Sequence, residues 1–492
     1  MRPLRITESI LFGTAVWLFW WLVFPQGLAY REQNQLFLFS LEYLSGRLAV
    51  PGGGADLISE FIMQFCRIPW LGAALMSLIF VALQVALRRL SGGHGYLSFL
   101  PPVLLLVLMG DIYVSFSFVV ALAAIAWLSV ICGNHPSPAF VFPAILLSFW
   151  LFGPASWVFV AFAVMKSLRP VAWLYPVYSM TLVYMAHLIV LQQYSWKQVL
   201  FGTGYYDIPL ICPPLMWVTA ASCVAVPVLA ALERKFRRVT VLEYAIGTSV
   251  IVLVSFFGIR KTYDRDNYEI LAYEQLIRDE KWQEVVARAE KYQPKVDVAC
   301  VSVNLSLFMC GRFAELDKFY QCGTRGLLMP RVRDNVSNVS TGEAFWRLGF
   351  VNEALRYAFD TQESIPNLKK SPRAMMRMAE CQMVNGRYKV ASKYLDILKK
   401  SLFYHSWAVE HEKYLGNKTL MEANPVYRYL RTVRNTDDYL FHYPEMDKML
   451  VRLYLHCRNN NMAAWYYKAW QALKQLDDED TKTDNGSGVH DS

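Results

Sequence analysis

The sequence predicts an all-α protein in which a polytopic transmembrane helical domain is followed by a soluble helical-repeat domain. Hydrophobic residues make up 55% of the 492-residue chain, and the long apolar runs lie before residue 260. Residues 241–259, VLEYAIGTSVIVLVSFFGI, are apolar except for Glu243 and a few small side chains. This stretch is long enough to cross a hydrocarbon core of ~30 Å. After it, charged residues return, and a pattern of glycine, small residue and aromatic residue recurs.

These contrasts divide the chain into three parts. Residues 1–260 form the predicted transmembrane domain, and residues 30–67 within it form a predicted interfacial loop. Residues 261–476 form the helical-repeat domain, whose charge density is that of a soluble protein. The tail at 477–492, DDEDTKTDNGSGVHDS, is polar and acidic. We therefore expect the tail to be disordered.

The transmembrane domain is expected to contain about nine spans. Six apolar runs are long enough to be spans, and three shorter runs complete the count. The long runs are 10–29, 69–86, 113–132, 171–191, 212–232 and 241–259, and the shorter ones are 96–109, 138–151 and 155–165. Gly153 and Pro154 are expected to join the last two short runs as a tight hairpin. The first run lacks an evident signal-peptidase site, so we expect it to remain attached as a helix.

The basic residues predict how these spans are oriented. With the amino terminus in the cytoplasm, the connections on that side are the basic ones, as the positive-inside rule requires. The cytoplasmic set is Arg2, Arg5, Arg88, Arg89, Lys166, Arg169, Arg234, Lys235, Arg237 and Arg238. Nine spans then place the helical-repeat domain on the opposite side. We expect a multi-pass protein of the bacterial inner (plasma) membrane with a periplasmic C-terminal domain and no nucleic-acid partner, because these clusters account for much of the net charge of +9.

The loop at 30–67 is too apolar for a flexible linker. Residues 35–48 and 55–65 both place apolar side chains at helical spacing. The sequence Pro51-Gly-Gly-Gly breaks the pattern between them. We expect two amphipathic helices that lie in the membrane interface with their apolar faces toward the lipid.

Two acidic residues at the predicted outer ends of spans are candidate functional groups. Glu32 follows the first span, and Asp111 lies in the turn MGDIYVS between the third and fourth spans. One interpretation is that both are helix-end groups in water. The other places both in one outward-facing, water-filled cavity, since ionisable groups at membrane depth are costly to bury and are commonly functional.

This arrangement resembles the membrane glycosyltransferases of the GT-C fold over roughly residues 1–200. The shared features are a first span, an acidic residue at the start of a long outer loop, a Pro-Gly turn and paired short spans. The resemblance implies a loop carboxylate that acts as base toward the acceptor, and a polyprenyl-phosphate sugar as donor. Glu32 would be the base, Asp111 a second acidic group, and Arg31 or Arg47 would face the phosphate. A paired-acid DxD motif is not evident, and the span count is low for that family.

The chain also resembles an uncharacterised bacterial family of multi-spanning membrane proteins that carry the same REQ…PGG loop and a helical C-terminal region. That resemblance covers most of the chain and implies no activity.

A repeat runs through the C-terminal half. Each copy places a small or apolar residue five positions, and an aromatic residue eight positions, after a glycine. The clearest copies are Gly311…Leu316…Phe319, Gly349…Ala354…Tyr357 and Gly386…Ala391…Tyr394, with degenerate copies at Glu280 and Asn459. The pattern resembles the tetratricopeptide repeat. That resemblance implies a curved stack of helix pairs whose groove binds a peptide or protein. An unrelated helical bundle is the alternative.

Residues typical of metal or cofactor sites form no recognisable set. Four of the nine cysteines lie before residue 260 and five after it, without the spacing of a zinc site. We expect no cofactor and no metal, and we expect most cysteines to be small buried side chains. The disulfide state of the C-terminal cysteines stays open.

Two functions follow from these observations. The first is an integral membrane protein of the cell envelope, in contact with membrane lipid, whose extracytoplasmic repeat domain binds a protein or peptide partner. The alternative is a GT-C-like membrane glycosyltransferase that uses a polyprenyl-phosphate-linked sugar. The sequence leaves open whether the protein is an enzyme.

Overall fold

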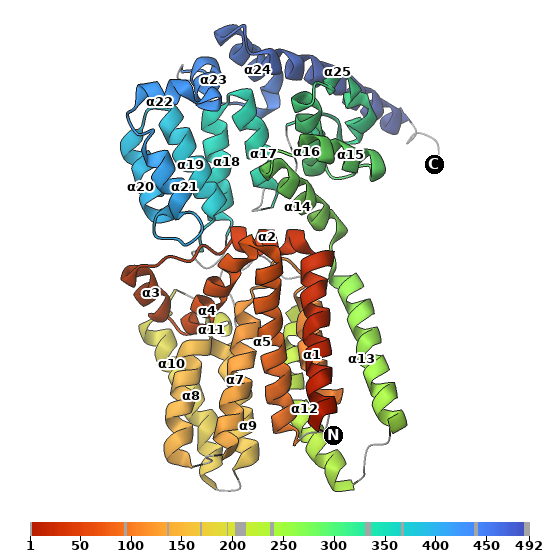
Figure 1. Cartoon of the computed structure of the whole chain (residues 1–492), viewed down its shortest axis with the longest axis vertical. Coiled ribbons are helices and arrows are strands. Elements are labelled where there is room, and N and C mark those ends of the chain that lie inside the picture. Colours follow the sequence, from red (N-terminus) through yellow and green to blue (C-terminus); the bar gives the residue numbers. More distant parts are fainter. Residues whose placement is uncertain are drawn as a thin grey trace. The chain divides into compact units, whose positions relative to one another are not determined.

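The computed structural model describes residues 2–92, 96–134, 137–167, 170–193, 195–201, 213–236, 241–328, 330, 336–365, 369–436 and 441–486. Across these ranges the ordered elements are helices and none is a strand, which confirms the all-α prediction (Figure 1). The chain divides into two compact units. The first comprises Met1–Asp264 with Pro366–Lys369, and the second comprises Arg265–Ile365 with Lys370–Ser492.

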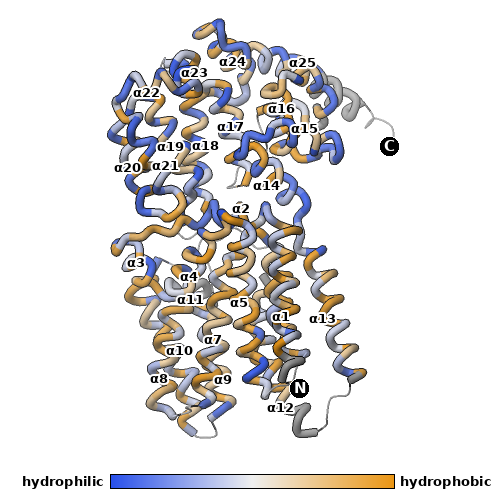
Figure 2. The backbone as a smooth tube through the Cα atoms, viewed as in Figure 1, coloured by the Kyte–Doolittle hydropathy of each residue, from blue (hydrophilic) through white to orange (hydrophobic). Residues whose placement is uncertain are grey.

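The first unit is a helical bundle. Its elements are α1 (Arg2–Leu18), η1 (Phe19–Val23), α2 (Pro25–Gln33), α3 (Leu41–Leu48), α4 (Gly53–Met63), η2 (Gln64–Arg67), α5 (Pro69–Leu90), η3 (Tyr96–Phe99), α6 (Leu100–Leu108), α7 (Ser117–Asn134), α8 (Pro138–Phe152), η4 (Gly153–Ala155), α9 (Ser156–Lys166), η5 (Pro170–Trp173), α10 (Leu174–Ile189), α11 (Trp196–Phe201), α12 (Pro213–Phe236) and α13 (Val241–Thr262). Helix α5 packs against α1 and α7 at the centre, and α7 packs in turn against α9. Figure 2 shows that apolar residues extend along most of these helices.

Five helical stretches are long and apolar enough to cross a membrane. They are Ile6–Val23, Pro69–Leu90, Ser117–Asn134, Pro138–Lys166 and Leu242–Thr262. The fourth contains α8 and α9, which η4 joins at the predicted Gly153–Pro154 turn. The remaining predicted spans coincide with α6, α10 and α12. The described residues of these helices do not meet the requirements for both length and apolar character. The membrane character of the first unit is therefore supported, and the total of nine spans stays a prediction.

Helix α13 shows why the apolar surface of this unit needs lipid. It contacts η3 and α6 through small residues: a Cβ at Gly247 would lie 2.4 Å from the Tyr96 ring of η3, and one at Gly258 would lie 2.6 Å from Val107 of α6. The Thr262 hydroxyl donates a hydrogen bond to the Val107 carbonyl at 2.8 Å. The opposite face leaves large apolar side chains such as Phe256 exposed. An exposed apolar face of this length is stable in hydrocarbon and unfavourable in water.

The first predicted span was wrong in its C-terminal part. The helix expected to run to residue 29 ends in the π-helical turn η1, and Phe24 leaves helical geometry with φ −129° and ψ 48°. Pro25 then starts α2 at its first position. A proline is well placed there because it lacks an N–H and disfavours helical geometry in the preceding residue.

Both helices predicted in the loop are present, but the first is shorter than expected. Residues 35–39 are not helical, so only α3 remains of the helix expected over 35–48, and Ser40 caps it by accepting a hydrogen bond from the Tyr43 N–H. Helix α4 packs against α7 and α8. It buries polar Ser59 and Glu60 along with its apolar residues. One face of α4 therefore packs into the bundle, while Ile58 and Phe61 stay exposed, and its position at a membrane interface stays a prediction.

The glycine run between these helices permits close packing. The Gly52 N–H, at φ +90°, donates to the Trp150 carbonyl at 2.9 Å. A Cβ at Gly53 would lie 1.7 Å from the Arg47 carbonyl oxygen, and one at Gly54 would lie 2.9 Å from that of Leu151. The predicted break is confirmed, and its reason is the close approach of this backbone to the end of α8.

The second unit consists mainly of helix pairs. Its elements are α14 (Arg265–Arg278), α15 (Trp282–Lys291), α16 (Asp297–Met309), η6 (Phe313–Gly326), α17 (Ser337–Leu348), α18 (Val351–Glu363), α19 (Pro372–Val384), α20 (Tyr388–Leu398), α21 (His405–Glu412), α22 (Lys418–Ala423), α23 (Pro425–Val433), η7 (Tyr443–Glu445), α24 (Met446–His456) and α25 (Asn461–Gly486). Helices α17 to α20 pack in consecutive order. The expected disorder from residue 477 is not seen in the backbone up to Gly486, since α25 continues to that residue.

Four repeat positions share one backbone conformation. Gly311, Gly349 and Gly386 have φ of +73°, +98° and +74°, and each separates the two members of a helical pair. Glu280, in the degenerate copy, has φ +54° and is the one positive-φ residue other than glycine in the described structure. A left-handed residue ends one helix and redirects the chain into the next. The sequence spacing thus marks structurally equivalent turns.

The stack is less regular than the pattern suggests. The element after Gly311 is the 3₁₀ segment η6, which is kinked at Phe319 and Gly323. Helix α25 returns to pack against η6, where the rings of Phe313 and Tyr466 stack with centroids 5.2 Å apart. The C-terminal helices therefore close back onto an earlier pair.

The turn glycines generate a stability prediction. A Cβ at Gly386 would meet no atom within 4 Å, so Gly386→Ala should cost only the backbone penalty of about 1 kcal/mol in free energy of unfolding. Gly349→Ala should cost more, because its Cβ would lie 2.6 Å from Val433. Denaturant unfolding of the purified variants, followed by circular dichroism, measures both. Equal losses would contradict the role assigned to Val433.

Candidate functional site

The predicted site residue Arg31 fastens α2 to the turn between α6 and α7. Its guanidinium donates hydrogen bonds to the carbonyls of Val114 at 2.6 Å, Met109 at 2.9 Å and Asp111 at 3.2 Å. It also lies over the Trp20 ring, 5.6 Å from the centroid. Three backbone oxygens of this turn thus accept hydrogen bonds from the buried cation, which joins the turn to α2.

The two predicted acidic residues, Glu32 and Asp111, lie close to the hydrogen bonds of Arg31 and are buried. Asp111 is 0% exposed, and its carboxylate accepts a hydrogen bond from the Tyr113 N–H at 2.9 Å. Glu32 is 3% exposed and accepts from the Gln33 side-chain amide at 2.8 Å. The structure thus links the Arg31 side chain to the turn that carries Asp111, 80 residues later in the chain. Neither carboxylate is a solvated helix-end group.

Arg47 lies in a different part of the loop and pairs with Glu60. The Arg47 guanidinium is 2.8 Å from the Glu60 carboxylate, which also accepts a hydrogen bond from the Tyr43 hydroxyl. Glu60 is 0% exposed. Burial raises the pKa of Glu60 to about 8 and lowers the pKa of Arg47. The pair joins α3 to α4, and the Arg47 guanidinium compensates the Glu60 carboxylate once it ionises where water is excluded.

The structure brings further polar residues into this part of the first unit. Sequence reasoning missed them, because they lie on helix faces that also carry apolar residues. Ser59 donates to the Gln35 side-chain oxygen at 3.2 Å. Ser117 of α7 donates to the Asp56 carboxylate of α4 at 2.6 Å. Asp56, Ser59, Glu60 and Met63 are three or four residues apart, so one helical face carries both kinds of side chain. We call Arg31, Glu32, Gln35, Arg47, Asp56, Ser59, Glu60 and Asp111 the loop polar cluster.

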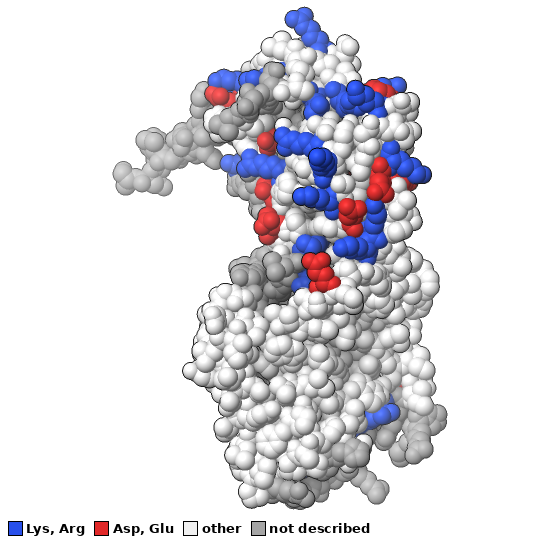
Figure 3. Space-filling view, turned by 90° about the vertical axis from the view of Figure 1, so that its left-hand side faces the viewer, with Lys and Arg blue, Asp and Glu red and all other residues white. Residues whose placement is uncertain are grey.

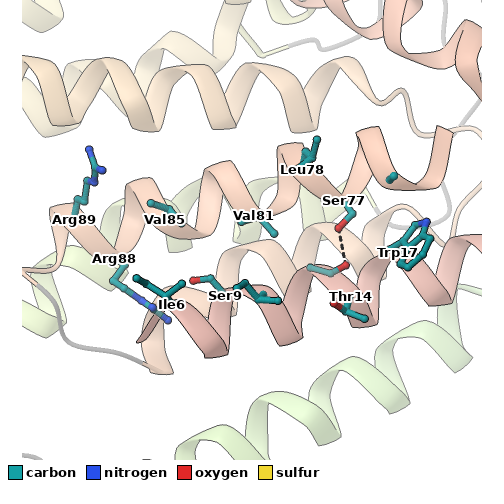
Figure 4. Close-up of a pocket in the computed structure, with 13 residues that line it drawn as sticks. Ile6, Ser9, Thr14, Trp17, Ser77, Leu78, Val81, Val85, Arg88 and Arg89 are labelled. Carbon is teal, nitrogen blue, oxygen red and sulfur yellow. Dashed lines mark hydrogen bonds between the residues drawn. The ribbon is translucent and has the colours of Figure 1, made fainter. Parts of the chain in front are cut away.

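An apolar groove lies between α1 and α5, with a volume of about 720 Å³. Trp17 lies toward one end, and Arg88 and Arg89 lie at the other (Figure 4). The helices meet at Gly13, whose carbonyl accepts a hydrogen bond from Ser77 at 2.6 Å. Arg88 pairs with Glu8 at 3.1 Å, which joins the start of α1 to the end of α5. The lining is otherwise apolar and suits an apolar chain, and the arginine end already holds this internal ion pair.

The second unit contains a buried ion network. Glu343 of α17 accepts from Arg347 at 2.8 Å and from Arg377 of α19 at 2.5 Å. Arg347 also bonds Glu280 at 2.6 Å, and the Arg377 guanidinium lies over the Trp346 ring at 4.3 Å. Burial acts to raise the pKa of Glu343, but the two guanidinium groups outweigh it and hold that pKa below its ordinary value. The network stabilises the packing of successive pairs. It also gives the Glu280 side chain a partner across the stack.

The surface of the second unit differs from that of the first. On the face in Figure 3, Lys, Arg, Asp and Glu side chains gather over the second unit and are scarce over the first. Trp465 of α25 is 48% exposed, beside Phe313 with ring centroids 6.4 Å apart. The Lys468 ammonium lies 5.3 Å from the Trp465 ring. Tryptophan is enriched among the residues that contribute most to binding in protein–protein interfaces.

Metal binding finds no support in the described part of the chain, where no group of three or more His, Cys, Asp or Glu side chains could hold an ion.

The Arg47–Glu60 pair generates a prediction with a pH dependence. Arg47→Met should lower the free energy of unfolding by about 3 kcal/mol near pH 8, where Glu60 ionises, because the buried carboxylate then lacks its cation. The folded-state pKa of Glu60 is raised, so stability is lost as the pH rises toward about 8. The loss should therefore be larger near pH 8 than near pH 6. Thermal unfolding in detergent at both values measures it.

The matched controls for this prediction are a double variant and an exposed carboxylate. Arg47→Met with Glu60→Gln should recover most of the stability and lose the pH dependence. Glu42→Gln, on the exposed surface of α3, should change little. A double variant that is no more stable than Arg47→Met alone would refute the pairing energy assigned here.

Comparison with known proteins identifies one relationship. No curated protein and no solved structure matches this chain. The model of a family of unknown function, DUF6057, matches residues 2–477 and thus includes both units. The resemblance to an uncharacterised family is confirmed to that extent, and the chain belongs to the DUF6057 family.

Proposed function

We propose that this protein is an integral membrane protein of the bacterial cell envelope whose extracytoplasmic helical-repeat domain binds a protein or peptide partner. The first unit anchors the chain in the inner membrane, with its amino terminus in the cytoplasm, and contacts lipid. The second unit has the character of a tetratricopeptide-like stack. The observation that carries this proposal is the recurrence of a left-handed turn at Glu280, Gly311, Gly349 and Gly386 between paired helices.

The surface around Trp465 is the part of this domain that we assign to the partner. Trp346 and Trp470 of the same unit are buried, whereas Trp465 is left half exposed. Together with Phe313 it offers an aromatic surface, and Lys468 adds a positive charge. A segment with an apolar side chain next to a carboxylate matches both features.

Photo-crosslinking in living cells tests this proposal. A benzophenone amino acid at position 465 of the full-length protein should give one specific adduct. The same probe at Val409, an exposed position on α21, should not. Trp465→Ala should weaken binding of the captured partner roughly 30-fold, equivalent to about 2 kcal/mol. Identical adducts from both positions, or none from either, would refute the assigned surface.

A second candidate is a GT-C-like glycosyltransferase. Two observations favour it: a cluster with three buried carboxylates beside the first span, and an apolar groove of about 720 Å³ that suits the tail of a polyprenyl-phosphate sugar. In this proposal Glu32 is the base, Asp111 supports it, and Arg31 or Arg47 faces the phosphate after the loop opens. Opening is required because each of these side chains is now enclosed.

Replacement of Glu32 distinguishes the two candidates. If Glu32 is the base, Glu32→Gln should lower sugar transfer from a polyprenyl-phosphate donor by roughly 10²–10⁴-fold. Protein abundance should stay unchanged, and the exposed Glu42→Gln variant should keep full transfer. Glycan analysis of cell-envelope fractions, with immunoblotting for abundance, provides both measurements. Unchanged glycans in the Glu32 variant would exclude the catalytic role.

A further inference from the structure

Two cysteines of the second unit lie next to each other. Cys300 is in α16 and Cys322 is in η6, and their sulfur atoms are 3.5 Å apart. Both are thiols in this structure. Cys300 is 0% exposed, whereas Cys322 is partly exposed. The pair thus combines an enclosed sulfur with one that a reagent can reach.

The residues around the pair allow the Cys300 and Cys322 side chains to approach each other closely. A Cβ at Gly326 would lie 2.8 Å from the Cys300 Cβ and 2.9 Å from the Cys322 Cβ, so only glycine fits between the two side chains. The Asn304 amide donates to the Gly326 carbonyl at 2.9 Å and holds this end of η6 against α16. Gly326 and Asn304 therefore keep the two sulfurs near one another as part of the fold.

The contacts of the two thiols differ in a way that assigns their roles. The Cys300 thiol donates to the Cys322 sulfur, and this bond together with burial raises the pKa of Cys300. Cys322 also lies 3.4 Å from the Lys295 carbonyl, at the surface. Since the thiolate is the nucleophile in thiol–disulfide exchange, the accessible Cys322 is suited to attack first.

We propose that Cys300 and Cys322 form an intramolecular disulfide bond in the mature protein. The proposal rests on the proposed placement of the second unit outside the cytoplasm, where disulfides persist. The oxidant is a disulfide-bonded partner, such as an oxidised thiol oxidoreductase. The Cys322 thiolate attacks one sulfur of that disulfide and releases the other as a thiolate, which takes a proton from water. Cys300 loses its proton and attacks Cys322, which forms the new bond and releases the second thiol. The partner is reduced by two electrons.

The bond adds a covalent link between two elements that packing and the Asn304–Gly326 hydrogen bond already hold together. Segment η6 is kinked, and α25 packs against it, so a covalent link from η6 to α16 stabilises one end of the helical-repeat domain. A link across 22 residues restricts the unfolded chain substantially.

The first test uses purified full-length protein in detergent with oxidised glutathione as the oxidant. Peptide mass spectrometry should find residues 300 and 322 linked. The melting temperature of the second unit should rise by about 5–10 °C relative to reduced protein. Cys322→Ser should abolish both effects, and Gly326→Ala should weaken the linkage. Cys310→Ser, at another partly exposed cysteine, should leave both unchanged. Glutathione on Cys322 and Cys310 without the 300–322 link would overturn the proposal.

The second test uses growing cells. Thiols are blocked by a membrane-permeant maleimide at lysis, and the protein is then denatured, reduced and labelled with a heavy maleimide. Two newly labelled cysteines, absent in the Cys300→Ala variant, are expected. If the link forms in purified protein but both thiols are already blocked in cells, the proposed bond in the mature protein is overturned together with the extracytoplasmic placement. Partner capture at Trp465 is independent of this result, so the two failures are distinguishable.

Discussion

The first unit depends on how it satisfies a buried arginine. Three backbone carbonyls of the turn between α6 and α7 hold the Arg31 guanidinium, and this contact joins the segment after the first apolar helix to a turn 80 residues later. An irregular turn beside an apolar bundle has few partners for its carbonyls, because hydrocarbon offers none. The Arg31 guanidinium carries five N–H donors, so it can bond several of these carbonyls at once. The position of Asp111 follows from it.

The same constraint explains the rest of the loop polar cluster. Glu60 would be costly alone in its site, and Arg47 and Tyr43 make its burial tolerable. The glycines at 52–54 let the backbone approach α8, where Trp150 exchanges hydrogen bonds with the loop. The loop is thus a packed layer of the bundle. If the protein is a glycosyltransferase, this layer must open so that substrate can reach the carboxylates. If the protein is a scaffold, the layer stays closed.

The second unit solves a different problem, namely how to stack helix pairs in water. Left-handed turns redirect the chain, small residues such as Gly342 let paired helices approach, and the Glu343 network compensates charges between pairs. Its surface is correspondingly charged (Figure 3). The aromatic surface around Trp465 forms where α25 packs against η6. The thiol pair forms where η6 packs against α16. In both cases the contacting residues are separated in the sequence.

The sequence by itself determined the all-α class, the apolar helices, the glycine break at 52–54 and the left-handed turns at Gly311, Gly349 and Gly386. These follow from local properties: hydropathy over a helix length and the freedom of glycine to adopt positive φ. It also indicated Arg31, Glu32 and Asp111 as unusual polar residues. It did not reveal Glu60, because a buried glutamate and a solvated one occupy the same helical spacing. Only the tertiary structure decided four other features, since each depends on which distant segment supplies a partner for a buried group. These features are the break at Phe24, the hydrogen bonds of Arg31 to the α6–α7 turn, the return of α25 and the Cys300–Cys322 pair.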